Sequence, residues 1–126
     1  MDQEKVEILN QLNQHHEVLI EQLKIVEQQI SEIGTFDEEL NIIKSQKDAE
    51  ILAPLGKSVF AFMKLNSDKK FFVDVGAGYF VRKNVDETKM VAKDQKQRLE
   101  MFKTQLSNEI QNITSSLREL IETHNS

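Results

Sequence analysis

The protein has 126 residues, carries a formal net charge of -5 and contains no cysteine. An acidic surface of mixed charge argues against nucleic acid and anionic membranes as ligands, because both need a basic binding face. The absence of cysteine excludes disulfides, thiolate chemistry and cysteine-based zinc sites, and it fits a reducing intracellular setting. The polar N-terminus and the shortness of the apolar stretches predict neither a secretory signal nor a membrane span. We therefore expect a cytoplasmic protein of one domain.

Residues that interrupt helices are concentrated in the centre of the chain. The only proline, Pro54, and three of the four glycines lie between residues 54 and 78, and five of the seven phenylalanines lie near them. This distribution predicts helix one over residues 1–52, a β-hairpin assembly segment over residues 53–84, and helix two over residues 85–124. Helix one should end near Leu52, because Pro54 excludes Ala53 from the α region.

The first arm has the apolar pattern of a coiled-coil strand. Its apolar positions, with one polar member, alternate in steps of three and four: Leu9, Leu12, His16, Leu19, Leu23, Val26, Ile30 and Ile33. Such a stripe requires a partner helix along its length. The step from Ile30 to Ile33 and the next one, from Ile33 to Phe36, are both of three residues, and two consecutive steps of three predict a stammer, a local overwinding, beside Gly34.

The second arm is the predicted partner of the first. Asn84 and Glu87 have the spacing of a capping box at a helix N-terminus. The stripe that follows is Ala92, Gln95, Leu99, Phe102, Leu106, Ile110, Ile113, Leu117, Leu120 and His124, with a stutter at Leu106 and Ile110. A short connection makes the arms antiparallel, each reaching about 60 Å. Helix ends near residues 50 and 86 predict that facing residue numbers sum to roughly 136, with His16 near Leu120.

The centre reads as β-structure that is not stable alone. Strands are expected at residues 58–65 and 70–75, joined as a hairpin by the polar turn at 66–69, with a third strand at 79–83 and a short fourth at 51–55. Both faces of these strands are rich in apolar side chains. An isolated hairpin is marginal in water, and exposed apolar edges favour association. The sequence therefore predicts that the protein oligomerises through its centre.

No motif in the sequence favours catalysis or cofactor binding. Gly76-Ala77-Gly78 resembles the start of a dinucleotide fingerprint, but Val81 stands where a third glycine would be needed, which favours a turn. His15, His16 and His124 could meet near the free ends of the helices, yet no carboxylate or cysteine set with ligand spacing accompanies them. His16 is better explained as a polar position that fixes helix register. We expect no cofactor, no metal and no enzymatic activity.

Several apolar residues lie off the coiled-coil stripes. They are Val6, Ile8, Val18, Ile20 and Ile25 in the first arm and Ile121 in the second. Two explanations remain open for them: ordinary scatter of apolar residues or packing against a third helix on the one hand, and an adaptable apolar surface for binding partners on the other.

The central residues carry a resemblance to a known family. Ile51-Leu52-Ala53-Pro54-Leu55-Gly56, then a strand, then Phe72-Val73-Asp74-Val75-Gly76-Ala77-Gly78-Tyr79-Phe80-Val81-Arg82-Lys83, resembles the prefoldin alpha-class subunit. The family pattern is a P-L-G segment, a strand and a V-G-A-G segment between long helices. Arg82 stands where the family usually has glutamate, a departure that affects one salt bridge at most.

The resemblance implies a fold, partners and a function. The implied fold is mainly α with a small β insert, a long antiparallel coiled coil with two central β-hairpins that contribute to an oligomeric β-barrel. The implied assembly is a hexamer of two alpha and four prefoldin beta-class subunits. Its helix tips would bind non-native polypeptides and pass them to a group II chaperonin without ATP hydrolysis. The alternative is a structural coiled-coil scaffold subunit without client binding.

Two sets of candidate site residues follow. The candidate client-binding residues at the tip are Val6, Ile8, Leu9, Leu12, Leu117, Leu120 and Ile121. The candidate subunit-assembly residues are Pro54, Leu55, Val59, Phe60, Phe62, Phe72, Val73, Val75, Gly76, Gly78, Tyr79, Phe80 and Val81.

Overall fold

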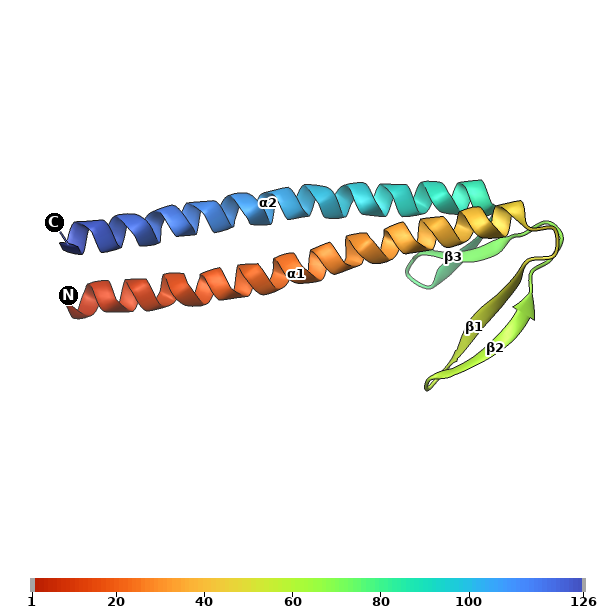
Figure 1. Ribbon diagram of the computed structural model, residues 1–126, viewed down its shortest axis with the longest axis horizontal. Helices are drawn as coiled ribbons and strands as arrows, with labels where there is room; N and C mark the ends of the chain where they lie inside the picture. Colours follow the sequence, from red (N-terminus) through yellow and green to blue (C-terminus); the bar gives the residue numbers. More distant parts are fainter. Residues whose placement is uncertain (1, 126) are drawn as a thin grey trace. The chain divides into compact units, whose positions relative to one another are not determined.

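The computed structural model describes residues 2–125, and side chains as far as residue 123. Its elements are α1 (Gln3–Ser45), β1 (Glu50–Gly56), β2 (Val59–Lys64), β3 (Phe71–Gly76), β4 (Tyr79–Lys83) and α2 (Val85–Asn125), as drawn in Figure 1. The predicted fold class is confirmed, since two long helices flank two small antiparallel hairpins. The chain divides into two compact units. The helical unit contains the residues up to Ser31 and from Gln97 onward, and the hairpin unit is Glu32–Lys96.

The helical unit is a pair of helix segments that run side by side in opposite directions (Figure 1). Leu19, Val26 and Leu106 are buried between them. Partly buried residues extend this core along both segments, namely Leu23, Ile30, Leu99, Ile110 and Ile113. These residues belong to the predicted stripes, so the coiled-coil interpretation of both arms is confirmed in this unit. We call the row of positions through which α1 and α2 face each other within a unit the helix seam.

A lysine occupies the seam position that the sequence assigned to a phenylalanine. Lys103 is half-buried and its Nζ lies 3.8 Å from Oε1 of Glu27, whereas Phe102 is 44% exposed. With Lys103 included, the seam of α2 runs in alternating steps of four and three through Leu99, Lys103, Leu106, Ile110, Ile113, Leu117 and Leu120. The predicted stutter at Leu106 and Ile110 is therefore wrong.

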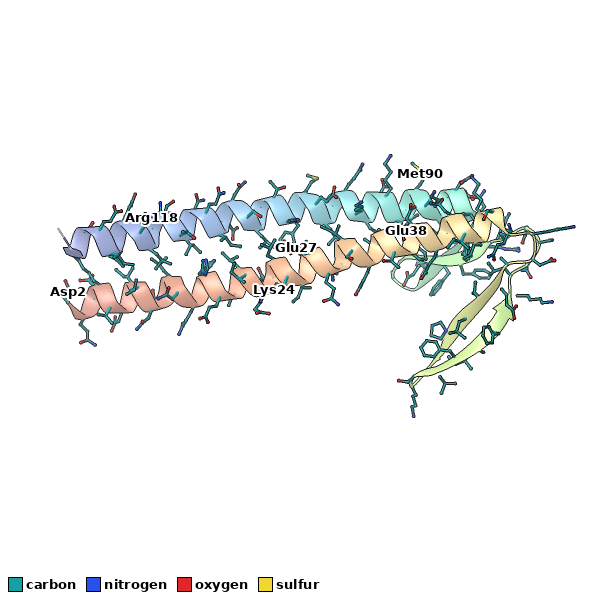
Figure 2. All side chains as sticks on the ribbon, in the orientation of Figure 1. Asp2, Lys24, Glu27, Glu38, Met90 and Arg118 are labelled. Atoms are coloured by element: carbon teal, nitrogen blue, oxygen red, sulfur yellow. The ribbon has the colours of Figure 1, made fainter. Side chains whose placement is uncertain are left out.

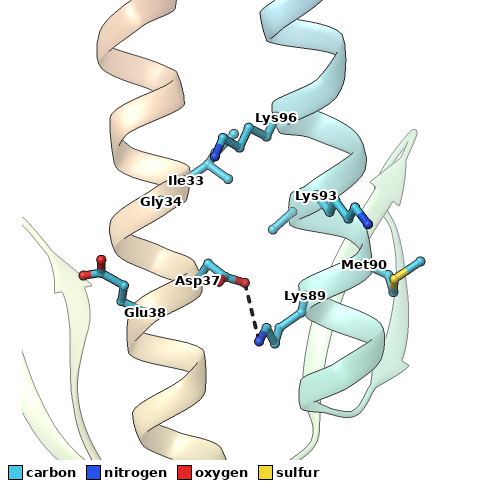
Figure 3. Close-up of a pocket in the computed structure, with 9 residues that line it drawn as sticks. Ile33, Gly34, Asp37, Glu38, Lys89, Met90, Lys93 and Lys96 are labelled. Carbon is cyan, nitrogen blue, oxygen red and sulfur yellow. Dashed lines mark ion pairs between the residues drawn. The ribbon is translucent and has the colours of Figure 1, made fainter.

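The hairpin unit shows the same exchange on α1. Phe36 is 43% exposed, while its neighbour Asp37 is half-buried and Leu40 is only 1% exposed. Oδ1 of Asp37 lies 3.9 Å from Nζ of Lys89 on α2, the ion pair drawn in Figure 3. The seam thus continues from Ile33 through Asp37 to Leu40 in steps of four and three. The predicted stammer at Phe36 is also wrong, because the seam keeps its heptad spacing and accepts a paired charge.

Helix α1 ends at Ser45, seven residues before the predicted end at Leu52. Ile51 and Leu52 instead pair with Met63 and Phe62 of β2. The connector between helix and strand is anchored, since Ala49 is buried and its carbonyl accepts a 2.9 Å hydrogen bond from the Leu65 amide. Pro54 correctly predicted that helix one is interrupted, but the strand that contains Pro54 already begins at Glu50.

The earlier helix end changes the register of the helix pair. Lys44 Nζ lies 2.7 Å from Asp86 Oδ1 in the hairpin unit, and Lys103 pairs with Glu27 in the helical unit. The residue numbers of each pair sum to 130 rather than to the predicted 136. The difference follows from the helix ends, which lie at Ser45 and Val85 instead of near residues 50 and 86.

The strands pair differently from the prediction. β1 pairs with β2 and β3 pairs with β4, each as a separate antiparallel two-stranded sheet. The expected hairpin between residues 58–65 and 70–75 does not form. Lys57 and Ser58 turn the first hairpin with φ of 51° and 62°, and Ala77 and Gly78 turn the second with φ of 51° and 78°. Two successive positive φ values match the twist of a tight hairpin, which explains why these pairs make the hairpin turns. The predicted turn at 66–69 does form, since the Lys69 amide donates a 2.8 Å hydrogen bond to the Asn66 carbonyl, but it connects β2 to β3, which lie in different sheets.

The predicted capping box at the start of α2 is confirmed. The Glu87 amide donates a 2.8 Å hydrogen bond to Oδ1 of Asn84, and the Asn84 amide donates one of 3.0 Å to Oε1 of Glu87. These bonds satisfy backbone donors that the first helical turn leaves without partners. They fix the point at which β4 passes into α2.

Candidate interaction surfaces

The two hairpins expose large apolar side chains. Phe62, Phe72 and Tyr79 are 77%, 72% and 73% exposed, and Figure 2 shows rings projecting from the β1–β2 hairpin. Of the candidate assembly residues, only Val73 is half-buried, and all the others are exposed. We call the exposed apolar members the hairpin surface: Leu55, Val59, Phe60, Phe62, Phe72, Val75, Tyr79, Phe80 and Val81.

The pairing of the strands determines which residues of the hairpin surface lie opposite one another. Phe62 lies opposite Leu52 and Phe60 lies opposite Pro54 on the first hairpin, and Phe80 lies opposite Asp74 on the second. Each sheet has two strands, so every strand is an edge with unpaired backbone N–H and C=O groups. An exposed apolar surface beside open edges suits the addition of further strands from another chain.

Sequence reasoning missed two further exposed apolar residues of the hairpins. Leu52 and Met63 are both at least half exposed on the β1–β2 hairpin. Both lie in predicted strands, Leu52 at 51–55 and Met63 at 58–65, but neither is among the candidate assembly residues. The observed β1 extends the predicted short strand by one residue at each end, and its proline suits an edge strand.

The candidate client-binding residues fall into two groups in the helical unit. Val6, Ile8 and Ile121 are exposed. The other four, Leu9, Leu12, Leu117 and Leu120, are half-buried at seam positions. The exposed group is open to a partner as it stands, whereas the seam group is open only if the helix ends separate.

Other apolar residues of the helical unit are exposed away from those positions. Val18 and Ile25 on α1 and Met101 and Phe102 on α2 all face solvent. Ile20, which the sequence grouped with Val18 and Ile25, is half-buried. Sequence reasoning missed Phe102 because it assigned the only aromatic residue of that stretch to the seam.

The described residues contain no group of three histidine, cysteine or acidic side chains that could hold a metal ion. His15 is exposed and His16 is half-buried, while the side chain of His124 lies outside the described residues. None of the described helices combines the length and the apolar character that crossing a membrane requires.

A shifted pKa is found at Asp86, in the first turn of α2. The hydrogen bond and the charge of Lys44 hold the pKa of Asp86 below its ordinary value. Both side chains are more than half exposed. This pair joins the last turn of α1 to the first turn of α2, and its exposure suits a structural role.

Comparison with known proteins agrees with this arrangement. The family model described as Prefoldin subunit matches residues 6–125. The chain is 37% identical over 83 residues to Prefoldin subunit 5 of Homo sapiens, a match that covers 64% of this chain and 53% of that protein. It is 28% identical over 119 residues to Prefoldin subunit alpha of Archaeoglobus fulgidus, covering 94% of this chain and 87% of that subunit.

The fold is also found in a solved structure. The cryo-EM structure of filamentous PFD from Methanocaldococcus jannaschii superposes with a TM-score of 0.78 and 20% identity, and the match covers 92% of this chain and 97% of that chain. The match to the human relative spans about half of that protein's length. The family model, in contrast, accounts for nearly all of the chain, with both helices and both hairpins in the expected order. The chain therefore belongs to the prefoldin family, with similarity to the alpha subunits of that family.

Proposed function

We propose that this chain is a subunit of an ATP-independent chaperone that holds unfolded polypeptides. It assembles through the hairpin surface with beta-class subunits, in a hexamer of two alpha and four beta chains. The helix tips bind the client, and the complex passes the client to a group II chaperonin in the cytoplasm. Prefoldin subunits are chaperone-type and non-enzymatic, and this part of the function follows from family membership.

The observation that carries the assembly proposal is the exposure of the hairpin surface. Apolar area removed from water contributes roughly 25 cal/mol per Å². A fully buried phenylalanine therefore contributes about 2 kcal/mol, and the hairpins expose four of them together with Tyr79. Partner strands that cover these residues would also satisfy the open backbone edges.

The client-binding proposal is supported by the exposed tip residues. Val6, Ile8 and Ile121 offer only a small apolar area on one chain. Several such tips in one complex would act together, because linked weak sites raise the effective concentration of each other. A complex that binds the unfolded state also lowers its free concentration by mass action, which slows aggregation.

A triple variant of the assembled complex tests the client-binding proposal. Val6→Ser, Ile8→Ser and Ile121→Ser together should weaken the suppression of aggregation severalfold for several unrelated denatured proteins. The helices should be retained, because all three side chains are exposed. The matched control is Val18→Ser with Ile25→Ser, which removes exposed apolar groups elsewhere on α1 and should leave suppression nearly unchanged.

Two outcomes would overturn the proposal in different ways. If the triple variant, and a truncation lacking residues 1–12 and 114–126, suppress aggregation as well as the unaltered complex, the tip is not the client site. If the unaltered complex slows the aggregation of none of the denatured proteins, the chain is a scaffold subunit and not part of a holding chaperone.

A further inference from the structure

A hollow lies between α1 and α2 of the hairpin unit, with a volume of about 480 Å³. Its floor is formed by Ile33, Gly34 and the buried Ala92. The α2 rim carries lysines and the α1 rim carries Asp37 and Glu38 (Figure 3). The hollow is thus apolar below, basic on one side and acidic on the other.

Gly34 leaves the α1 side of the hollow without a side chain at this position. A Cβ built on this residue would meet no atom within 4 Å, and the residue lies inside α1 without a positive φ. Alanine would therefore fit, and it would favour the helix over glycine. The glycine lowers the helical stability of the free chain and leaves space that nothing in the described unit fills.

Two lysines of the α2 seam each pair with a carboxylate. Lys89 pairs with Asp37 and also donates a hydrogen bond to the Asn41 side chain. Lys103, two heptads further along the helix, pairs with Glu27. Lys96 stands seven residues from each, at the same heptad position, and Figure 3 shows its side chain reaching toward Ile33.

Lys96 has no such partner. Within the part of the chain that the structure describes, the ion pairs include Lys89 and Lys103 but neither Lys96 nor Lys93. The helix position beside Lys96 is Gly34, which has no side chain to offer. A carboxylate is therefore the group whose absence distinguishes this heptad from its two neighbours.

We propose that the hollow receives an acidic side chain from a protein partner. The aspartate or glutamate of the partner would lie over Gly34, with its carboxylate against Lys96 and Lys93. The hollow is larger than one side chain, so an apolar neighbour on the partner would pack on Ile33 and the exposed, adaptable Met90. A continuous polyanion such as nucleic acid is disfavoured, because Asp37 and Glu38 would repel it from the opposite rim.

This docking site does not depend on client binding at the helix tips. It lies in the hairpin unit, whereas the candidate client residues all lie in the helical unit. A failure of one proposal therefore leaves the other standing.

The test uses the assembled complex and a labelled helical peptide with glutamate residues four apart and leucines between them. Fluorescence anisotropy at low salt should show binding, and the same peptide with glutamine in place of glutamate should bind at least tenfold more weakly. Lys96→Gln should weaken binding of the acidic peptide about tenfold. Lys24→Gln removes an exposed lysine from the other unit and should leave binding unchanged.

Gly34→Glu is the decisive variant. It supplies the missing carboxylate within the chain, so it should block the acidic peptide and raise the melting temperature. Aggregation suppression by this variant should stay at the level of the unaltered complex. The proposal is overturned if the acidic peptide does not bind, if it binds Gly34→Glu as before, or if Lys24→Gln weakens binding as much as Lys96→Gln.

Discussion

Lys103 and Glu27 meet across the helix seam with 3.8 Å between Nζ and Oε1, while Phe102, the preceding residue of α2, lies outside the seam and is 44% exposed. The seam keeps its heptad spacing, with a lysine at this position instead of the neighbouring aromatic residue. Lysine tolerates this position because its apolar stem can lie along the seam while its amine reaches a carboxylate at the edge.

Leucine at position 103 should therefore stabilise the helix pair. Lys103→Leu replaces a partly exposed ion pair with an apolar seam residue, and we expect a gain of about 1 kcal/mol in the free energy of unfolding. Phe102→Ser should change it by less than about 0.5 kcal/mol, because the ring lies outside the seam. Thermal unfolding of both variants at equal concentration measures the difference. If Phe102→Ser lowered the free energy of unfolding by more than about 1 kcal/mol, Phe102 would have to be a seam residue.

Lys69 is the expected anchor between the hairpins and the end of α1. Its amine donates a 2.9 Å hydrogen bond to the Lys44 carbonyl and a second bond to the Gln46 carbonyl. Lys69→Met keeps the length of the side chain but removes both bonds, and should cost about 1 kcal/mol in unfolding free energy. Lys70→Met is the matched control, since Lys70 is exposed. Hydrogen exchange of the last turn of α1 should rise in the first variant only, and equal exchange in both would contradict the anchoring role.

The capping box should contribute measurably to α2. Asn84→Ala removes the side-chain acceptor of the Glu87 amide and should cost about 1 kcal/mol. Asn112→Ala makes the same change at an exposed position inside α2, where alanine favours the helix and should stabilise by about 0.5 kcal/mol. Opposite shifts in melting temperature are the expected result. Shifts of the same sign would mean that the cap bonds contribute little.

The pair between Lys44 and Asp86 should give the helix base a dependence on acid. The pKa of Asp86 in the folded chain lies below its ordinary value of 3.8, so the unfolded chain binds its proton more readily. The stabilising contribution is therefore present above pH 3.8 and is lost as the pH falls through the lower, folded-state pKa. Asp86→Asn should lower the melting temperature at neutral pH and make no difference once Asp86 itself is protonated. A difference that persists unchanged in strong acid would assign the effect to packing.

The fold class could be predicted from the sequence because the strongest signals were long and regular. A 3-4 stripe from Leu9 to Ile33 leaves few alternatives to a coiled coil, and Asn84 with Glu87 defines a helix start within one residue. The predicted seam positions at Phe36 and Phe102 were wrong for the same reason. Ranking residues by hydrophobicity placed each phenylalanine in the seam, whereas heptad spacing placed the neighbouring Asp37 and Lys103 there. Where the two criteria conflict in this protein, spacing decides.

The hairpin pairing could not be deduced from composition. Asn66-Ser67-Asp68-Lys69 has the more polar sequence, but Lys57-Ser58 and Ala77-Gly78 adopt the left-handed backbone that a tight hairpin needs. Lysine and serine are not residue types that favour a positive φ, so the turn at Lys57 and Ser58 could not be predicted from them. The hollow at Gly34 was equally hidden, because its character depends on which residues of α1 and α2 face each other, and a six-residue error in that register moves every pair.

The native mass of the complex purified from its source cells tests the central claim most directly, namely that this chain is a subunit that assembles through its hairpins. The proposal predicts a hexamer with two copies of this chain and four of a smaller helical partner. Phe62→Ser with Phe72→Ser, on the two most exposed phenylalanines, should break the hexamer into smaller species while the helices persist. A monomer or a simple homodimer of the unaltered chain would contradict the account.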